Sequence, residues 1–299
     1  GTTAMVARAV VAFGKPELVE EVMPKVFSGE VRMCLGYTEP EGGSDIATCK
    51  TRAVRDGDQW VINGSKMFTS NAQNASYVFL LTNTDPQGPK HKNLTMFLVP
   101  LDTPGIEIQP IRTLDGDRTN IVFYTDVRVD DSQRIGEVNG GWTVMRFALD
   151  AEHGLTEPDQ AGLKSVSTMS GHALVMSEAV DTAAGLVGAD ADESVQHRLG
   201  RSVARMEAAL STPGMYGRVA IAQTMRDISA DLMDVLGPAA ALPTDSAGSV
   251  GAGAAEYLFR LGLPMGIYGG TLEVFRNMIA QHELKLGRPT YAPGSSAKT

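Results

Sequence analysis

Hydrophobic and polar positions change their periodicity twice along the chain. In residues 1–30, Val6, Val10 and Val11 recur at helical spacing, and Pro16 opens a second short helical stretch that continues through Val22. The first 30 residues are therefore predicted to form two short helices.

From Val31 to Asn139 the pattern is that of strands. Short apolar runs recur at intervals of roughly ten residues, and turn residues separate them. The runs are Gln59–Ile62, Tyr77–Leu81, Thr95–Val99, Ile106–Ile108, Ile121–Tyr124 and Val127–Val129. Among the turn signals, Asn63-Gly64 is typical of a hairpin. Because no helical stretch lies between the runs, we expect an antiparallel sheet or barrel.

From Trp142 onward the pattern is helical again. Long segments rich in Ala, Leu, Met and Val predict an antiparallel bundle, and they are Gly171–Ala184, Ser194–Leu210, Gly217–Leu236 and Thr271–Leu286. The stretch Leu236–Gly253 is predicted to be a loop. The prediction is an α+β fold with three domains, namely helices over 1–30, a β-domain over 31–139 and a helical bundle over 140–299.

Composition narrows the class of protein. The 299 residues are 43% hydrophobic and 20% charged, as in an ordinary globular protein, and a net charge of −9 argues against a nucleic-acid binder. Cys34 and Cys49 form neither a disulfide framework nor a metal-ligand spacing. No apolar stretch approaches the roughly 20 residues of a membrane span, and the first residues lack the layout of a signal peptide. We expect a cytoplasmic protein without a metal.

The segment Thr38-Glu-Pro-Glu-Gly-Gly-Ser-Asp45 is the first candidate for chemistry. Gly42 and Gly43 let the backbone come close to a planar or anionic group, and Ser44 adds a short hydroxyl donor. The same composition is also that of a plain turn at the end of a strand. The residues of this segment leave both interpretations open.

The segment Asn63-Gly-Ser-Lys-Met-Phe-Thr-Ser-Asn71 is the second candidate. It leads from the Asn-Gly signal into a strand that ends with an aromatic residue beside small hydroxyl side chains. An aromatic face with hydroxyl donors suits an isoalloxazine ring, which has a π surface and polar edges. Packing within a sheet explains Phe68 equally well when this segment is taken alone.

Together these segments resemble the acyl-CoA dehydrogenase family, and the likeness extends over most of the chain. Further motifs follow in the family order, and they are Thr103-Pro-Gly-Ile106, Asp126-Val-Arg-Val129, Gly140-Gly-Trp142 and Tyr268-Gly-Gly-Thr-Leu-Glu-Val-Phe-Arg276. The resemblance implies the family fold, with truncated N-terminal helices, a central antiparallel β-domain and a C-terminal four-helix bundle.

The resemblance also implies a reaction, which is oxidation of an acyl-CoA thioester to the 2,3-enoyl-CoA with FAD. A carboxylate removes the α-proton while the β-hydrogen leaves as hydride to flavin N5. Matching the motifs implies that the flavin contacts Leu35, Tyr37, Thr38, Phe68, Ser70, Thr271 and Glu273. It implies that the substrate contacts Ser44, His153, Tyr268 and Gly269.

The catalytic base needs a separate argument. Many relatives carry it as Glu in Y-E-G-T, but here that position is Gly269. A subgroup that includes the isovaleryl and long-chain enzymes places it in the helix after G-W, within L-x-x-E-R. This chain has Leu149-Asp-Ala-Glu-His153 there, so Glu152 is the candidate base. Desolvation beside flavin and thioester raises the pKa of a carboxylate toward neutral pH. The alternative is a solvated glutamate without a role.

Two family features are missing. The family's R-x-x-F-G, whose Arg reaches a neighbouring subunit's FAD, corresponds to Thr182-Ala-Ala-Gly185, and its F-G-G-x-G turn corresponds to Leu236-Gly-Pro238. Both losses fall on the half-site that is donated to a partner. We therefore expect an oligomer, a homo- or hetero-oligomeric dimer of dimers, in which a different subunit could supply the missing Arg.

Three functions compete at this point. The first is an acyl-CoA dehydrogenase that passes electrons to an electron-transfer flavoprotein or a similar acceptor. The second is a structural partner subunit that keeps the fold without catalysing a reaction. The third is an acyl-CoA oxidase, which shares these motifs and passes electrons to oxygen.

Overall fold

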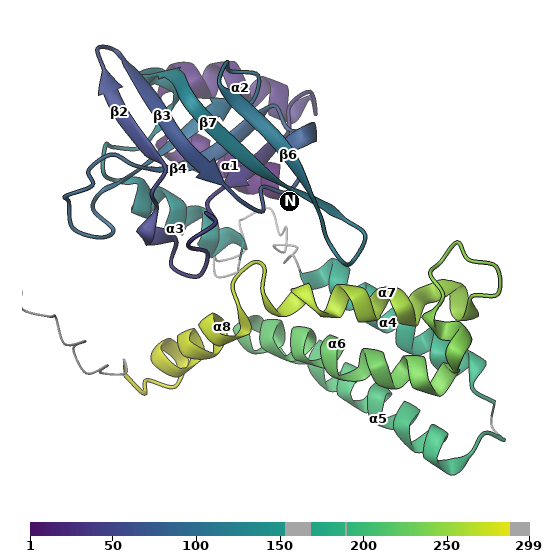
Figure 1. Cartoon of the computed structure of the whole chain (residues 1–299). Coiled ribbons are helices and arrows are strands. Elements are labelled where there is room, and N and C mark those ends of the chain that lie inside the picture. Colours follow the sequence, from purple (N-terminus) through teal and green to yellow (C-terminus); the bar gives the residue numbers. More distant parts are fainter. Residues whose placement is uncertain (153–168, 189, 288–299) are drawn as a thin grey trace, which may run out of the picture. The chain divides into compact units, whose positions relative to one another are not determined.

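The computed structural model describes residues 1–152, 169–188 and 190–287, with side chains as far as Asp150 and again from Gly171 (Figure 1). The chain forms two compact units, Gly1–Thr168 and Met169–Thr299. The first unit contains the sheet and the second contains the bundle. Each unit is described by itself below.

Two helices open the first unit, as the sequence predicts. They are α1 (Thr2–Phe13) and α2 (Pro16–Phe27). Pro16 starts α2 because its fixed φ suits the first helical position, where no backbone N–H is needed. Val6, Val10 and Val22 are fully buried and mark the core-facing side, whereas Val11, which was named with them, is exposed.

The central element is an eight-stranded sheet in the order β6-β7-β3-β2-β4-β5-β8, with β1 paired to β4. Its strands are β1 (Met33–Gly36), β2 (Arg52–Asp56), β3 (Gln59–Lys66), β4 (Tyr77–Asn83), β5 (Leu94–Pro100), β6 (Ile106–Arg112), β7 (Arg118–Asp130) and β8 (Arg134–Ile135). Antiparallel pairing joins β2 to β3, β3 to β7, β7 to β6, β4 to β5 and β5 to β8, which confirms the predicted sheet. The sheet is mixed, however, because β1 and β2 both pair with β4 in parallel, which was not predicted.

Two sequence predictions about the strands are wrong. The runs Ile121–Tyr124 and Val127–Val129 belong to one 13-residue strand, β7, in which Asp126 has a φ of 49°. Asn63-Gly64 is not a hairpin turn, because it lies inside β3 at a β-bulge opposite β7. The turn between β2 and β3 is instead at Gly57, which has a φ of 63°. A bulge uses the same glycine freedom as a turn, so the dipeptide does not distinguish the two.

Both faces of the middle strands are buried. On one face Phe79, Leu81 and Met96 pack against α1, α2 and α3 (Gly141–Glu152). On the other face Val78 and Phe97 pack with side chains of β3 and β7, including Trp60, whose ring lies edge-on to Phe97 at 5.5 Å. In Figure 1, α1 and α2 lie behind the sheet. This double burial fixes the register of β4, because a one-residue slip would exchange the two faces.

The second unit is a helical bundle of α4 (Met169–Leu186), α5 (Glu193–Leu210), α6 (Gly214–Leu236) and α7 (Ala254–Gly262), followed by α8 (Leu272–Met278). The predicted segments therefore form helices with slightly shifted ends. The segment predicted as one helix over Thr271–Leu286 consists of α8 and a π-helical turn, Ile279–Glu283. Between α6 and α7, the predicted loop contains two short 3₁₀ turns.

An ion-pair ladder joins α5 to α6. Arg198 donates to Asp231 at 2.8 Å, Arg201 pairs with the same carboxylate, and Arg205 pairs with Asp227. The hydrogen bond from Arg198 holds the pKa of the Asp231 carboxyl below its usual range. The ladder fixes the register of the two helices, while the apolar core includes Met206, Ile228 and Leu232 among its members.

Candidate functional site

The segment after β1 folds back on itself. The amide of Glu39 donates to the carbonyl of Gly42 at 3.0 Å, and the Gly42 amide donates to the Glu39 carbonyl at 3.1 Å. The backbone of the segment therefore forms a turn, as one of the two interpretations of the sequence proposed. The side chain of Glu39, however, points into the protein and is 8% exposed.

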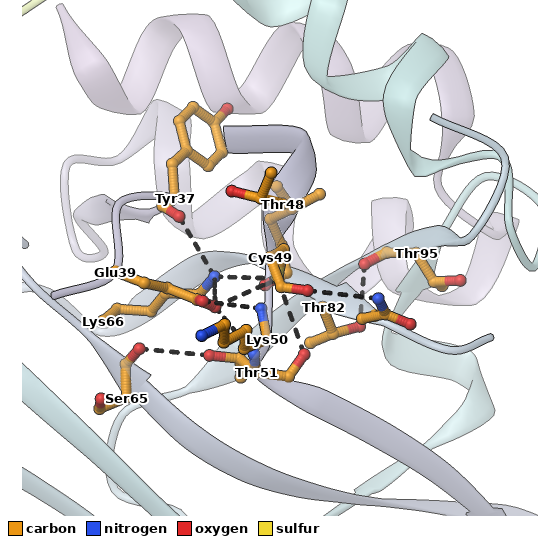
Figure 2. A network of polar contacts seen from close by, with 12 residues as sticks. Tyr37, Glu39, Thr48, Cys49, Lys50, Thr51, Ser65, Lys66, Thr82 and Thr95 are labelled. Carbon is orange, nitrogen blue, oxygen red and sulfur yellow. Dashed lines mark hydrogen bonds and ion pairs between the residues drawn. The ribbon is translucent and has the colours of Figure 1, made fainter. Parts of the chain in front are cut away.

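A buried ion pair joins the two candidate segments (Figure 2). Lys66, the last residue of β3, is fully buried, and its Nζ donates to Glu39 Oε1 at 2.8 Å. The same ammonium donates to the carbonyl of Tyr37 at 3.2 Å and to Cys49 Sγ at 3.3 Å. Three acceptors therefore surround a charge that burial would otherwise make very unfavourable.

The Glu39 carboxylate has a matching set of donors. Besides Lys66, it accepts from the backbone amides of Lys50 at 2.7 Å and Thr51 at 2.8 Å, and the Cys49 thiol donates to it at 3.2 Å. Burial raises the pKa of Glu39, but the Lys66 ammonium and the hydrogen bonds outweigh it and lower the pKa to about 2. Burial raises the pKa of Cys49 to about 11, so this sulfur stays a neutral thiol.

This cluster holds the backbones of the two segments together. While Lys66 binds the Tyr37 carbonyl, the amide of Met67 donates to the carbonyl of Thr38 at 2.8 Å. Figure 2 shows the Tyr37 ring pointing away from the cluster, on the side opposite the ion pair. Residues 37–38 and 66–68 therefore form one rigid surface, although about 30 residues separate them in the sequence.

Phe68 stands on that surface in an unusual conformation. Its φ is 59°, in the left-handed region that a bulky residue rarely adopts, and its side chain is 57% exposed. Asn71, three residues on, also has a positive φ, 63°. A large aromatic side chain that is held outward at a conformational cost is typical of a ligand contact. Packing within the sheet, the alternative left open by the sequence, is wrong for this side chain.

The start of β7 holds the two residues that follow Phe68. Asn120 is fully buried, donates from Nδ2 to the Thr69 carbonyl at 2.9 Å, and accepts the Thr69 amide at its own carbonyl at 2.9 Å. The hydroxyls of Ser70 and Thr119 lie 3.1 Å apart. Sequence reasoning missed Glu39, Lys66 and Asn120. The signal that it could have used is a polar residue at the end of an otherwise apolar strand pattern.

The other predicted residues of the first unit lie around this surface. Leu35 is half-buried in β1, Thr38 is half-buried and Ser70 is exposed. Ser44 is exposed on the loop after the closed turn, next to Asp45, which pairs with Lys90. The candidate base Glu152 is the last residue of α3, and its side chain lies outside the described residues, as does the whole of His153.

In the second unit, the predicted residues lie between α7 and α8. Tyr268 is exposed, and Gly269 has a φ of 63°. The Thr271 hydroxyl accepts the Val274 amide at 3.2 Å and so caps α8. Glu273 is exposed in the first turn of that helix and lies 3.5 Å from Arg276. The predicted site residues therefore occur in both units.

Comparison with known proteins shows the family and the fold. Residues 34–131 match the family model of the acyl-CoA dehydrogenase middle domain. The chain is 32% identical over 300 residues to the acyl-CoA dehydrogenase FadE26 of Mycobacterium tuberculosis, covering 95% of this chain and 75% of that protein. Two solved structures share the fold. One is the Tcur3481-Tcur3483 steroid ACAD, with a TM-score of 0.82, 33% identity and coverage of 95% of this chain and 75% of that chain. The other is the ChsE4-ChsE5 complex of M. tuberculosis, with a TM-score of 0.80, 32% identity and coverage of 95% of this chain and 76% of that chain.

These likenesses first define a class, the FAD-dependent flavoprotein oxidoreductases. The chain belongs to the acyl-CoA dehydrogenase family, and its α+β fold is that of the family. One of the solved relatives, ChsE4-ChsE5, is a complex, and the name of the other also joins two designations, Tcur3481 and Tcur3483. Within the part of the chain that the structure describes, no helix is both long and apolar enough to traverse a bilayer.

The residues present fit a flavin. An isoalloxazine ring needs a flat apolar contact and hydrogen-bond partners at its edge. The surface of the first unit offers the exposed ring of Phe68, whose backbone is strained, together with the Ser70 hydroxyl and the half-buried Thr38. These groups come from two segments that the buried ion pair joins.

Proposed function

We propose that this protein catalyses FAD-dependent α,β-dehydrogenation of an acyl-CoA thioester to the 2,3-enoyl-CoA. One observation carries the proposal: the buried Lys66–Glu39 pair fixes the two segments with the family's flavin motifs in one surface, from which Phe68 projects. A fold kept only for assembly does not require a bulky side chain at positive φ on an exposed surface.

The proposed roles of the chain follow from the motifs. Leu35, Tyr37, Thr38, Phe68 and Ser70 hold the isoalloxazine ring, and Thr271 and Glu273 complete its site. FAD supplies a hydride acceptor at N5 when it is bound. Ser44 lies on the thioester and pantetheine side, where His153, Tyr268 and Gly269 also contact the substrate. Backbone donors that polarise the thioester carbonyl stabilise the charge that develops there during proton removal.

Glu152 is the proposed base that removes the α-proton. It ends α3, near whose start Trp142 contacts His91, with ring centroids 4.1 Å apart and ring planes tilted by 37°. Val144, Met145 and Ala148 of this helix are buried in the core of the first unit. The anchored helix carries the backbone of Glu152, and proton transfer requires a base at a fixed distance from the proton. Gly269 has no side chain that could replace it.

The test of the catalytic proposal is Glu152→Gln, with Asp150→Asn as a matched control on the same helix. The purified protein, with any partner subunit that accompanies it, is mixed with acyl-CoA, and flavin bleaching is followed. We expect Glu152→Gln to lower turnover by at least about 100-fold, since removing general-base catalysis costs about 10²–10⁴-fold, while the oxidised flavin spectrum is unchanged. Asp150→Asn should retain activity.

The outcome also separates the competing functions. If the wild-type protein binds flavin but neither variant alters its reaction with acyl-CoA, Glu152 is not the base. If the wild-type protein bleaches no flavin with either a straight-chain or a steroid-bearing CoA thioester, the structural-partner function is favoured. The steroid thioester is included because the Tcur3481-Tcur3483 relative is a steroid ACAD. Stoichiometric hydrogen peroxide in air would instead identify an oxidase, whereas a dehydrogenase needs an electron-transfer flavoprotein or a similar acceptor.

We further propose that a different subunit completes the FAD site. The family's donated Arg and Phe correspond to Thr182–Gly185, which lies in the last turns of α4 and contributes no side chain larger than threonine. At the second position, α6 ends at Leu236, Gly237 follows as its C-cap and Pro238 begins a 3₁₀ turn. The ChsE4-ChsE5 relative is a complex of two chains, which supports the proposal. The test is the amount of FAD per chain: one tightly bound FAD per chain in a preparation of this chain alone would refute it.

A further inference from the structure

A short loop joins α7 to α8 and carries the second group of predicted site residues. It runs from Leu263 to Thr271 through a 3₁₀ turn, Pro264–Gly266. Gly269 and Gly270 then have φ values of 63° and 92°, and a Cβ on Gly270 would lie 2.8 Å from the Phe275 ring. The two glycines turn the chain sharply before α8 begins, so several carbonyls of the loop point away from any regular backbone partner.

The side chain of Arg218 donates hydrogen bonds to carbonyls of this loop. Arg218, on the second turn of α6, donates from Nη1 to the Met265 carbonyl at 3.1 Å. Its Nη2 donates to the Tyr268 carbonyl at 2.6 Å and lies 3.5 Å from the Gly270 carbonyl. The guanidinium carbon also lies over the Phe275 ring, 5.3 Å from its centroid. The loop is thus bound at its start, middle and end by one planar cation.

The loop has a second attachment through the ring of Tyr268. The Tyr268 hydroxyl lies 2.9 Å from Nε2 of His172 on α4 and 2.7 Å from Met265 Sδ. This contact fixes the ring, whereas Arg218 fixes the backbone on either side of Gly269. Backbone placement matters here because a glycine has only its amide and carbonyl to offer a ligand.

We propose that Arg218 is a positioning residue that holds the Tyr268–Thr271 backbone in the conformation that meets the thioester and the flavin. The inference rests on the proposed function, which places Tyr268 and Gly269 at the substrate and Thr271 at the flavin. Arg218 itself acts through the loop. An arginine suits the task because its planar, forked donors reach several carbonyls at once, whereas a lysine ammonium has no such fork.

The proposal predicts which kinetic constant changes. Donors that face the thioester carbonyl interact most strongly when negative charge develops on it, in the transition state. A displacement of about 1 Å in such a group costs about 100-fold in rate. Loss of the clamp should therefore lower kcat more than it raises KM.

The experiment compares Arg218→Lys and Arg218→Gln with Arg201→Gln as a matched control. Arg201 belongs to the same unit, pairs with Asp231 on the helix that also carries Arg218, and does not touch the loop. Each protein is purified as for the wild type, with any accompanying subunit. Thermal unfolding, hydrogen exchange of the amides of residues 266–272, FAD content, and kcat and KM with acyl-CoA are measured.

We expect Arg218→Lys to keep the wild-type unfolding temperature but to lose amide protection in residues 266–272 and to lower kcat by about 10- to 100-fold, with a smaller change in KM. Arg218→Gln should lose more amide protection and more kcat than Arg218→Lys does. Arg201→Gln should keep both the amide protection and the kcat of the wild type. The inference is overturned if Arg218→Lys exchanges these amides as slowly as wild type, or if the loop loosens while kcat is unchanged. Absence of turnover in the wild type would count against the proposed function alone, because the exchange measurement still tests the clamp.

Discussion

Replacement of Lys66 by methionine tests whether the buried ion pair holds the candidate flavin surface together. Methionine keeps a similar side-chain length but removes the ammonium that contacts the Tyr37 carbonyl, Glu39 and Cys49 at 3.2, 2.8 and 3.3 Å. The Glu39 carboxylate would then stay buried with its two backbone amide donors and no counter-charge. Breaking a buried pair by removing one partner costs about 3–5 kcal/mol.

The free energy of unfolding of the first unit is therefore expected to fall by about 3–5 kcal/mol at pH 7 in Lys66→Met. Urea unfolding followed by tryptophan fluorescence measures it, because the chain has two tryptophans, Trp60 and Trp142, and both belong to this unit. Adding Glu39→Gln should recover part of the loss, since the double variant buries no charge. The coupling between the two single changes should thus reach several kcal/mol.

The pH dependence gives an independent check on the same variant. In the wild type the pKa of Glu39 is lowered to about 2 from an ordinary value of 4.5. Without the ammonium, burial raises this pKa above that of the unfolded chain, so the variant regains stability as the carboxylate takes up a proton. The difference between variant and wild type should be smaller at about pH 4 than at pH 7. A loss below about 1 kcal/mol at pH 7, or a difference that grows on acidification, would refute the reasoning.

Two further results are expected. Gly64→Ala should destabilise the first unit by about 1–3 kcal/mol in the same urea assay, because φ is +145° and the new Cβ would lie 2.7 Å from Thr51 Cα. Gly57→Ala, with φ at +63° and no atom within 4 Å, should cost only about 1 kcal/mol, and equal costs would show that crowding at the bulge is unimportant. Acidification of the wild type should remove about 3 kcal/mol of stability between about pH 5 and pH 2 through Glu39 alone, since its folded pKa lies below the unfolded one. The slope of stability against pH in this range should be shallower in Glu39→Gln.

The strands and helices could be predicted where burial follows the local period. The continuous apolar run predicted β4 as a strand, and in the structure Val78 and Leu80 face one side of it while Phe79 and Leu81 face the other. The parallel partner β1 has only four residues, and such a short run carries no information about its partner. Asn63-Gly64 shows the opposite limit, because a dipeptide that permits positive φ serves a bulge as well as a turn.

The candidate site residues also divide into those that the sequence motifs name and those that only the fold reveals. The family motif proposes Phe68 and Ser70 as site residues, but it does not state that Phe68 has a strained backbone and an exposed side chain. Glu39 and Lys66 lie in the same motifs and received no role, since charged residues near a turn usually face the solvent. Their pairing is a contact across 27 positions of sequence, and only the topology of β1, β3 and β4 brings it about.

In each unit, a buried or half-buried cation positions the backbone that carries predicted site residues. In the first unit a cation, Lys66, binds the Tyr37 carbonyl in the segment that follows β1, and in the second unit a cation, Arg218, binds the carbonyls of Met265 and Tyr268 in the loop before α8. Irregular segments expose carbonyls that no neighbouring strand or helix turn satisfies, and a charged donor satisfies them strongly. Lysine suffices where the cluster is fully buried and one carboxylate dominates, whereas the loop presents several carbonyls at an exposed site and requires the fork of arginine. Because such a donor acts through the backbone, it can fix a ligand surface without touching the ligand, which is why matching the motifs gave neither cation a role.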